Sequence, residues 1–148
     1  MTGFRVGYAC APKYLLDAML RIHQYCMLCA GITSQEAAIE ALDHGFDEAM
    51  AMREHYLARR NYIVHALNEM GLTCHLPRGS FYAFPSIQST GLSSTEFAVK
   101  LLKETKVACV PGTAFGKSGE GFLRCCFATS MAQIEMAMDR VAKFLQKG

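Results

Sequence analysis

Two arginines in otherwise apolar segments are the residues of this sequence best suited to chemistry. Arg124 lies in FLRCCF, among residues of the kind that form a core. A buried guanidinium without an anion is strongly unfavourable, so Arg124 must meet one, and the nearby sequence offers only Glu120. Three arrangements satisfy it: an ion pair with a carboxylate elsewhere in the chain, a strand edge that lets it reach water, or bidentate binding of a ligand carboxylate.

Arg5 repeats this pattern in TGFRVGY. In a strand, Gly3 and Gly7 lie on the same face as Arg5 and leave space beside its side chain. A phosphate ester fits such a space, because a guanidinium fork matches its oxygens. The alternative is a helix packed closely on the two glycines. Arg5 and Arg124 together indicate a ligand with both a phosphate and a carboxylate.

Two other patterns resemble ligand sites and are weaker. GTAFGKS, residues 112–118, resembles a phosphate-binding loop, but it has one residue too few between the first glycine and Gly-Lys. A strand is also expected after it, where the motif needs a helix N-terminus. Cys26 and Cys29 form a C-x-x-C pair near His23, which is short of the four ligands of a structural zinc. We expect no metal site and buried, inert thiols.

Composition narrows the class of protein. The 148 residues are 51% hydrophobic and 19% charged, which is typical of one globular domain with a core. A net charge of +2 without a dense basic cluster argues against nucleic-acid binding. The longest uncharged run, residues 22–35, is too short to span a bilayer, and no secretory segment is evident. Seven cysteines without framework spacing indicate reduced thiols in the cytoplasm.

The first seventy residues are predicted to be mostly helical, after an initial strand. Residues 4–11 are nearly continuous in small and apolar residues, which predicts a strand buried on both faces. A helix is expected from Pro12. Its apolar face consists of Leu15, Leu16, Met19 and Leu20.

Two further helices are expected before residue 71. Thr33 and Glu36 have the spacing of a capping box for a helix that ends at Gly45. A long helix over residues 46–70 has an apolar stripe with a period near 3.6. Gly71 is placed to end it.

Residues 71–148 have the pattern of a ββαββα unit. Ser93 and Glu96 form a capping box for one helix, and Ser130 with Gln133 caps the last. The strands are expected in LTCHLP, GSFYAFPSI, VACVPG and GFLRCCFAT, the first two meeting at a turn over residues 77–79.

Five blocks in this order resemble a known family. TGFRVGY, QYCMLCAGITSQEAAIEAL, PRGSFYAFP, VACVPGTAFG and GFLRCCFA are similar to the C-terminal part of class I/II aminotransferases, which belong to the fold type I pyridoxal-phosphate enzymes. The resemblance covers nearly the whole chain and is nearest to the aspartate/aromatic branch. It implies an α/β fold in which residues 1–45 are a remnant of the large cofactor-binding domain. Residues 46–148 are then the connecting helix and a small domain with a mostly antiparallel sheet.

The resemblance also implies roles for individual residues. Arg5 matches the arginine that binds the phosphate of pyridoxal 5'-phosphate, and Arg124 matches the arginine that binds the substrate α-carboxylate. Phe81 and Tyr82 match an aromatic stretch near the substrate pocket, for which core packing is an equal alternative. Tyr25 lies in a segment that approaches the active site of the partner subunit in a homodimer.

The Schiff-base lysine is expected outside this chain. In the family it lies in an S-x-x-K type motif a few residues before the block that contains Arg5, a position that falls before Met1. Lys13 and Lys117 do not match that motif. We therefore expect no catalytic residue here, and a chain that is inactive alone.

Three functions remain open at this point. The first is part of a cytoplasmic, homodimeric aminotransferase that moves an amino group between an amino acid and a 2-oxo acid. The second is a non-catalytic dimerisation or binding module from a truncated gene. The third is a pyridoxal-phosphate-dependent C–S lyase of the same superfamily, which the fold cannot distinguish.

Overall fold

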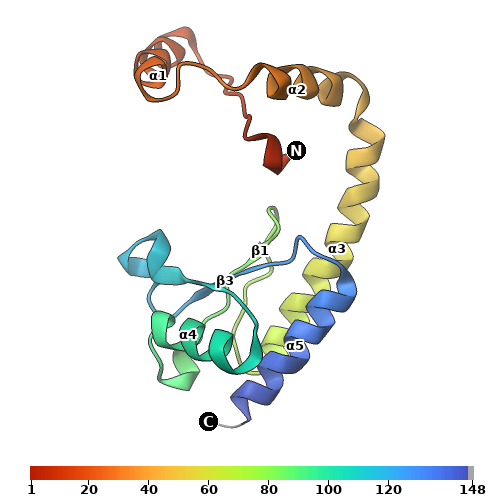
Figure 1. The fold of residues 1–148 in the computed structure, drawn as a ribbon, viewed down its shortest axis with the longest axis vertical. Helices are drawn as coiled ribbons and strands as arrows, with labels where there is room; N and C mark the ends of the chain where they lie inside the picture. Colours follow the sequence, from red (N-terminus) through yellow and green to blue (C-terminus); the bar gives the residue numbers. More distant parts are fainter. Residues whose placement is uncertain (147–148) are drawn as a thin grey trace. The chain divides into compact units, whose positions relative to one another are not determined.

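The structure is a computed structural model that describes residues 1–146 and divides into two compact units. The division falls inside helix α3 (Phe46–Glu69), between Ala51 and Met52 (Figure 1). Among the described residues, no helix has both the length and the apolar character needed to cross a membrane. The assignment of residues 1–45 to a large domain and 46–148 to a small one stays a prediction.

The first unit contains a short 3-10 helix, η1 (Thr2–Phe4), and the helices α1 (Lys13–Cys26) and α2 (Ile32–His44). The strand predicted over residues 4–11 is wrong. A strand needs a neighbour that takes its backbone hydrogen bonds, and no segment of residues 1–146 pairs with this one. The predicted helix from Pro12 is confirmed, with Pro12 as its N-cap residue.

The apolar side chains of the first unit are not buried. No residue among 1–51 is buried, and the expected core face of α1 is open, with Leu15 45% and Leu20 58% exposed. The predicted capping box of α2 is also wrong, because Gly31 is the N-cap and Thr33 falls inside the first turn. Instead, the Ser34 hydroxyl donates to the Phe4 carbonyl at 2.7 Å and links α2 to η1.

Helix α3 agrees with its prediction. Ile63, Val64 and Leu67 from its apolar stripe are buried. The helix ends at Glu69. Gly71 follows with a φ of +78°, a left-handed conformation that glycine adopts without strain. The Leu72 amide donates to the Leu67 carbonyl at 3.0 Å, and the Gly71 amide donates to the Asn68 carbonyl at 2.9 Å. These two bonds satisfy carbonyls that the helix end leaves free.

The sheet of the second unit has three short antiparallel strands, in agreement with the predicted mostly antiparallel sheet. They are β1 (Tyr82–Ala83), β2 (Val110–Pro111) and β3 (Leu123–Cys126), in the order β1-β3-β2. Tyr82 lies opposite Cys126 and Ala83 opposite Cys125, while Val110 lies opposite Arg124. The strand that contains Arg124 is therefore the central one.

The strand predicted in LTCHLP is not formed. Residues 72–77 have no strand structure, although Leu72 and Cys74 are buried. The side chain of Asn68 satisfies the backbone of Cys74 instead: its amide nitrogen donates to the Cys74 carbonyl and its oxygen accepts from the Cys74 amide, both at 3.0 Å. With these groups paired, residue 74 needs no neighbouring strand.

Two helices complete the second unit: α4 (Ser94–Thr105) and α5 (Met131–Leu145). The capping box of Ser93 and Glu96 is confirmed in both directions. Ser130 caps α5 by accepting from the Gln133 amide, as predicted. Short 3-10 helices lie in the loops: η2 (Gln88–Thr90), η3 (Gly112–Phe115) and η4 (Lys117–Gly119).

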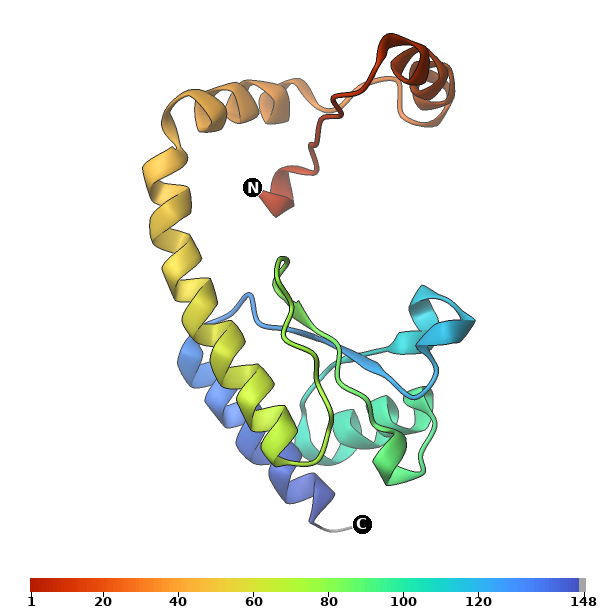
Figure 2. The ribbon, with the colours of Figure 1, turned by 180° about the vertical axis from the view of Figure 1, so that it is seen from behind.

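The core lies between one face of the sheet and the helices α3, α4 and α5. The second half of α3 and α5 run side by side in both views (Figures 1 and 2). The buried side chains come from every one of these elements, and Phe97 and Phe127 are the largest that are fully enclosed. The core includes Ile63, Leu67, Ala83, Phe97, Leu101, Leu123, Phe127, Ile134, Met138 and Val141.

Candidate functional site

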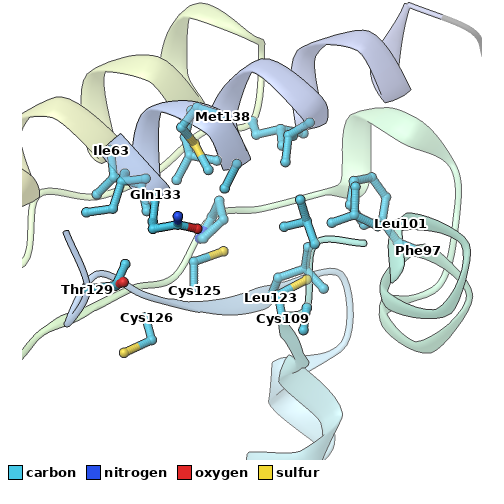
Figure 3. A pocket seen from close by; sticks show the side chains of 18 residues that line it. Ile63, Phe97, Leu101, Cys109, Leu123, Cys125, Cys126, Thr129, Gln133 and Met138 are labelled. Atoms are coloured by element: carbon cyan, nitrogen blue, oxygen red, sulfur yellow. The ribbon is translucent and has the colours of Figure 1, made fainter. Parts of the chain in front are cut away.

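The two faces of the small sheet have different characters. Ala83 and Leu123 point into the core, and the pleat places Tyr82 and Arg124 on the opposite face. Cys125 and Cys126 point in opposite directions, as expected for neighbours on a strand (Figure 3).

The core face encloses a small apolar cavity. Figure 3 shows its lining, in which Cys109 and Cys125 lie near Leu123, Phe97 and Met138. A hydrogen bond between the two thiols lowers the pKa of Cys109 and raises that of Cys125. The cavity holds about 90 Å³. Roughly three water molecules occupy this volume in liquid water, so the cavity is too small for an amino-acid substrate.

Arg124 on the outer face lies between two aromatic rings. Its guanidinium carbon is 4.3 Å from the centroid of the Tyr82 ring and 4.4 Å from that of Phe115. Tyr82 comes from β1, where the register makes it a diagonal neighbour of Arg124. Phe115 comes from the loop between β2 and β3. Each ring face attracts the cation, so Arg124 has two cation–π contacts, one from each of two separate elements.

Arg124 has no anionic partner among residues 1–146. It forms no ion pair there, and its guanidinium donates no hydrogen bond. Glu120, the carboxylate nearest in sequence, accepts instead from the backbone amides of Ser94 at 2.8 Å and Gly121 at 3.1 Å. These bonds lower the pKa of Glu120. The half-buried guanidinium of Arg124 therefore has N–H donors that are free to bind the carboxylate of a ligand.

The loop that carries Phe115 is held tightly. The Gly112 amide donates to the Phe122 carbonyl at 2.8 Å, and the Gly112 and Gly119 backbones approach so closely that a Cβ at either position would clash. This loop contains the sequence that resembles a phosphate-binding loop. Strand β3 follows it, as predicted, so the loop does not lead into a helix as a phosphate-binding loop does.

Arg5 is exposed in the first unit, just after η1. Its φ of +52° is left-handed, and its Nη1 donates to the Thr2 carbonyl at 3.2 Å. Within residues 1–51, a Cβ added at Gly3 or Gly7 would meet no atom within 4 Å, so the alternative of a helix packed on these glycines is wrong. Arg5 borders a hollow of about 980 Å³ that also includes Val6, Leu28, Ile39 and Leu42.

Comparison with known proteins agrees with the sequence resemblance. The profile of the family described as "Aminotransferase class I and II" matches residues 1–141. The chain belongs to the class I and II aminotransferase family. The "Putative aminotransferase YugH" of Bacillus subtilis is 54% identical over 99% of this chain, and an aspartate aminotransferase of Pyrococcus abyssi is 43% identical over 99%.

A solved structure shows the same fold. The aromatic aminotransferase of Pyrococcus horikoshii OT3 superimposes with a TM-score of 0.87 and is 41% identical, over 99% of this chain and 40% of its own. The α/β fold type I assignment is thereby confirmed. The chain spans about 38% of the length of the Bacillus and P. abyssi relatives. Members of this aminotransferase family depend on pyridoxal 5'-phosphate.

Two aminotransferase predictions concern residues that do not contact Arg124. Tyr25 lies near the end of α1 and is 88% exposed. Phe81 packs against the core and against Tyr56, with ring centroids 6.3 Å apart. Their roles in substrate binding stay predictions.

The expectation of buried thiols is wrong for Cys26 and Cys29, because both are exposed.

The two aromatic contacts of Arg124 differ in how far the sequence indicated them, since Tyr82 was named with Phe81 and Phe115 was not. Tyr82, and not Phe81, is the member of the aromatic pair that contacts Arg124. The alternation of the strand could have indicated this, since Tyr82 and Arg124 occupy the same face once the register is known. Phe115 had no such signal, because only the folding of the loop brings it onto the guanidinium.

Proposed function

We propose that residues 1–148 are the C-terminal part of a pyridoxal-phosphate-dependent aminotransferase that moves an amino group between an amino acid of the aspartate or aromatic type and a 2-oxo acid. Membership of the family over residues 1–141 supports this reading. So does the similarity to proteins described as aspartate and aromatic aminotransferases. The 38% share of the relatives' length supports a part of a larger enzyme.

The observation that carries the proposal is the free guanidinium fork of Arg124. Both substrates of a transaminase contain a carboxylate next to the reacting carbon. Arg124 binds that carboxylate through two parallel N–H···O bonds, which fix the substrate in position and orientation. Tyr82 and Phe115 contact the guanidinium through their rings and accept none of its N–H hydrogen bonds, so these donors stay available for the substrate.

Arg5 fits the phosphate end of the cofactor. It is exposed, it has no carboxylate partner among residues 1–146, and Gly3 and Gly7 leave open space next to it. A guanidinium in this setting can donate two hydrogen bonds to phosphate oxygens. Pyridoxal 5'-phosphate, when bound, supplies an electron sink for negative charge at the substrate α-carbon. Arg5 would hold it at its phosphate and takes no part in proton transfer.

The complete enzyme is proposed to be a cytoplasmic homodimer whose catalytic lysine lies outside residues 1–148. Lys13 is not proposed for that role, because its surroundings in the sequence do not match the family's lysine motif. Large apolar side chains of the first unit support burial against other protein surface in the whole enzyme. Among them Tyr8 is 77%, Tyr25 88% and Leu28 78% exposed.

A chimeric enzyme tests the proposal. Residues 1–148 replace the matching 38% of the Bacillus subtilis relative, and transamination is measured with aspartate and aromatic donors. Hydrogen bonds to a charged group contribute about 1.5–3 kcal/mol, so Arg124→Ala should lower kcat/KM roughly 10- to 150-fold, mainly through KM. Arg5→Ala should weaken retention of the cofactor during dialysis. Arg59→Ala is the matched control, because Arg59 also lies over a ring, that of Tyr56 at 5.3 Å.

Several results would count against this function. An unchanged KM in Arg124→Ala together with unchanged cofactor retention in Arg5→Ala contradicts both assignments. A chimera that binds no cofactor and transfers no amino group contradicts the proposed role of the whole segment. Release of a thiol and a 2-oxo acid from a cysteine conjugate without an amino acceptor would identify a C–S lyase instead.

A further inference from the structure

We propose that Tyr82 and Phe115 are positioning residues of the carboxylate site, which act by holding the Arg124 guanidinium in one plane. The proposal rests on the proposed function, since it takes Arg124 as the group that binds the substrate carboxylate. It adds two residues that neither contact the reacting atoms nor form the charged bond themselves. Their contribution is to fix the direction from which a carboxylate can approach.

The two rings enclose the guanidinium from separate elements. Tyr82 belongs to β1 and Phe115 to the end of η3, and their centroids lie 4.3 Å and 4.4 Å from the guanidinium carbon. Nearly equal distances to two rings mean that the cation is held between them and does not merely rest on one. Movement of the guanidinium away from this position would lengthen at least one of the two contacts.

Each ring is itself held by neighbouring aromatic side chains. Phe84 packs edge-on to Phe115 with centroids 6.4 Å apart and stacks on Phe122 at 5.6 Å with an interplanar angle of 18°. The Tyr82 ring lies 4.6 Å from that of Phe81. The closely packed Gly112–Gly119 loop fixes the backbone that carries Phe115. These contacts hold both rings in place beside the Arg124 guanidinium.

The chemical consequence concerns the direction from which a carboxylate can reach Arg124. The N–H donors of a guanidinium lie in its plane, and the two rings hold the cation without accepting a conventional hydrogen bond from these donors. An arginine in water samples many rotamers, and contact with two rings restricts those of Arg124, so less ordering remains to be done when the substrate binds. A planar carboxylate that approaches along the open edge meets two donors at once.

Variants that remove one ring test the proposal in the same chimeric enzyme. Tyr82→Leu and Phe115→Leu should each raise KM for the amino acid and the 2-oxo acid roughly 3- to 10-fold, in the range expected from loss of one cation–π contact. The value of kcat should stay within about twofold, because the proposal gives the two rings a role in binding the carboxylate and none at the reacting atoms. Tyr82→Phe keeps the ring and should keep KM. Arg59→Leu breaks the cation–π contact of Arg59 with Tyr56 and leaves every ring near Arg124 in place, so it is the control.

The outcomes separate this proposal from the proposed function. If Arg124→Ala raises KM but both leucine variants leave it unchanged, the positioning role is overturned and the function stands. If Arg124→Ala itself has no effect on KM, the result contradicts the proposed function, and the positioning role fails with it. A loss in Tyr82→Phe equal to that in Tyr82→Leu would assign the effect to the hydroxyl and overturn the role of the ring. Tyr82→Met and Phe115→Met fill similar volume without a ring and replace any leucine variant that does not fold.

Discussion

Ser94 provides the sharpest test of how the site is supported. Its side chain is fully buried at the start of α4. The hydroxyl accepts from the backbone amides of Gly121 at 2.9 Å and Phe122 at 3.2 Å, and it donates to the Gly119 carbonyl at 3.4 Å. One hydroxyl thus joins α4 to the end of the loop that carries Phe115. Replacing it with Ala removes three bonds and leaves the backbone in place.

The expected loss of stability in Ser94→Ala depends on which hydrogen bonds each backbone group keeps. The Gly121 amide still donates to the Glu120 carboxylate at 3.1 Å, and the Phe122 amide still donates to the Gly119 carbonyl at 3.2 Å. No buried group loses every partner, so the large penalty of an unsatisfied donor does not apply. We expect Ser94→Ala to lower the free energy of unfolding by about 1–2 kcal/mol, which is the net value of one or two ordinary hydrogen bonds.

Urea unfolding of the 148-residue chain measures this difference, followed by circular dichroism because the chain contains no tryptophan. Ser89→Ala is the control. Ser89 is exposed and its hydroxyl makes one bond, to the Gly71 carbonyl at 3.3 Å, so the change should stay within about 0.5 kcal/mol. Adding Glu120→Ala to Ser94→Ala removes the last side-chain acceptor of the Gly121 amide, and the double variant should lose more than the sum of the two single variants. A Ser94→Ala protein as stable as wild type, or strict additivity, would refute this account.

Two further predictions concern titratable groups. The amides of Ser94 and Gly121 lower the pKa of Glu120, so its contribution to stability is present above its ordinary value of 4.5 and is lost as pH falls through the lowered folded-state pKa. The stability difference between wild type and Glu120→Gln should therefore shrink below about pH 4.5, and a difference independent of pH would contradict it. Burial raises the pKa of Cys74, so a thiol reagent at neutral pH should label it only on unfolding; equal labelling rates in the folded chain would contradict the structure. The exposed thiols that should react first are Cys10, Cys26, Cys29 and Cys126.

Local sequence patterns determined much of the secondary structure. The long helix α3, its glycine end at Gly71 and the caps at Ser93 and Ser130 all follow from side chains that act within a few residues of themselves. Such signals are readable because the interacting groups are neighbours in the chain. The apolar run over residues 4–11 shows the limit of this approach. Its composition is that of a buried strand, but a strand exists only where a second segment supplies hydrogen bonds.

For the site, the sequence alone identified a charge in need of a partner, and the tertiary structure decided how that charge is held. The position of Arg124 among core-type residues was enough to predict that its guanidinium needs an anion or access to water, since burial of an unpaired guanidinium is unfavourable. That Glu120 is used by Ser94 and Gly121 could not be read from its proximity in sequence. Nor could the placement of Phe115, which reaches Arg124 only through the fold of its loop. Local chemistry sets which groups need partners, and the packing of distant segments decides which partners they receive.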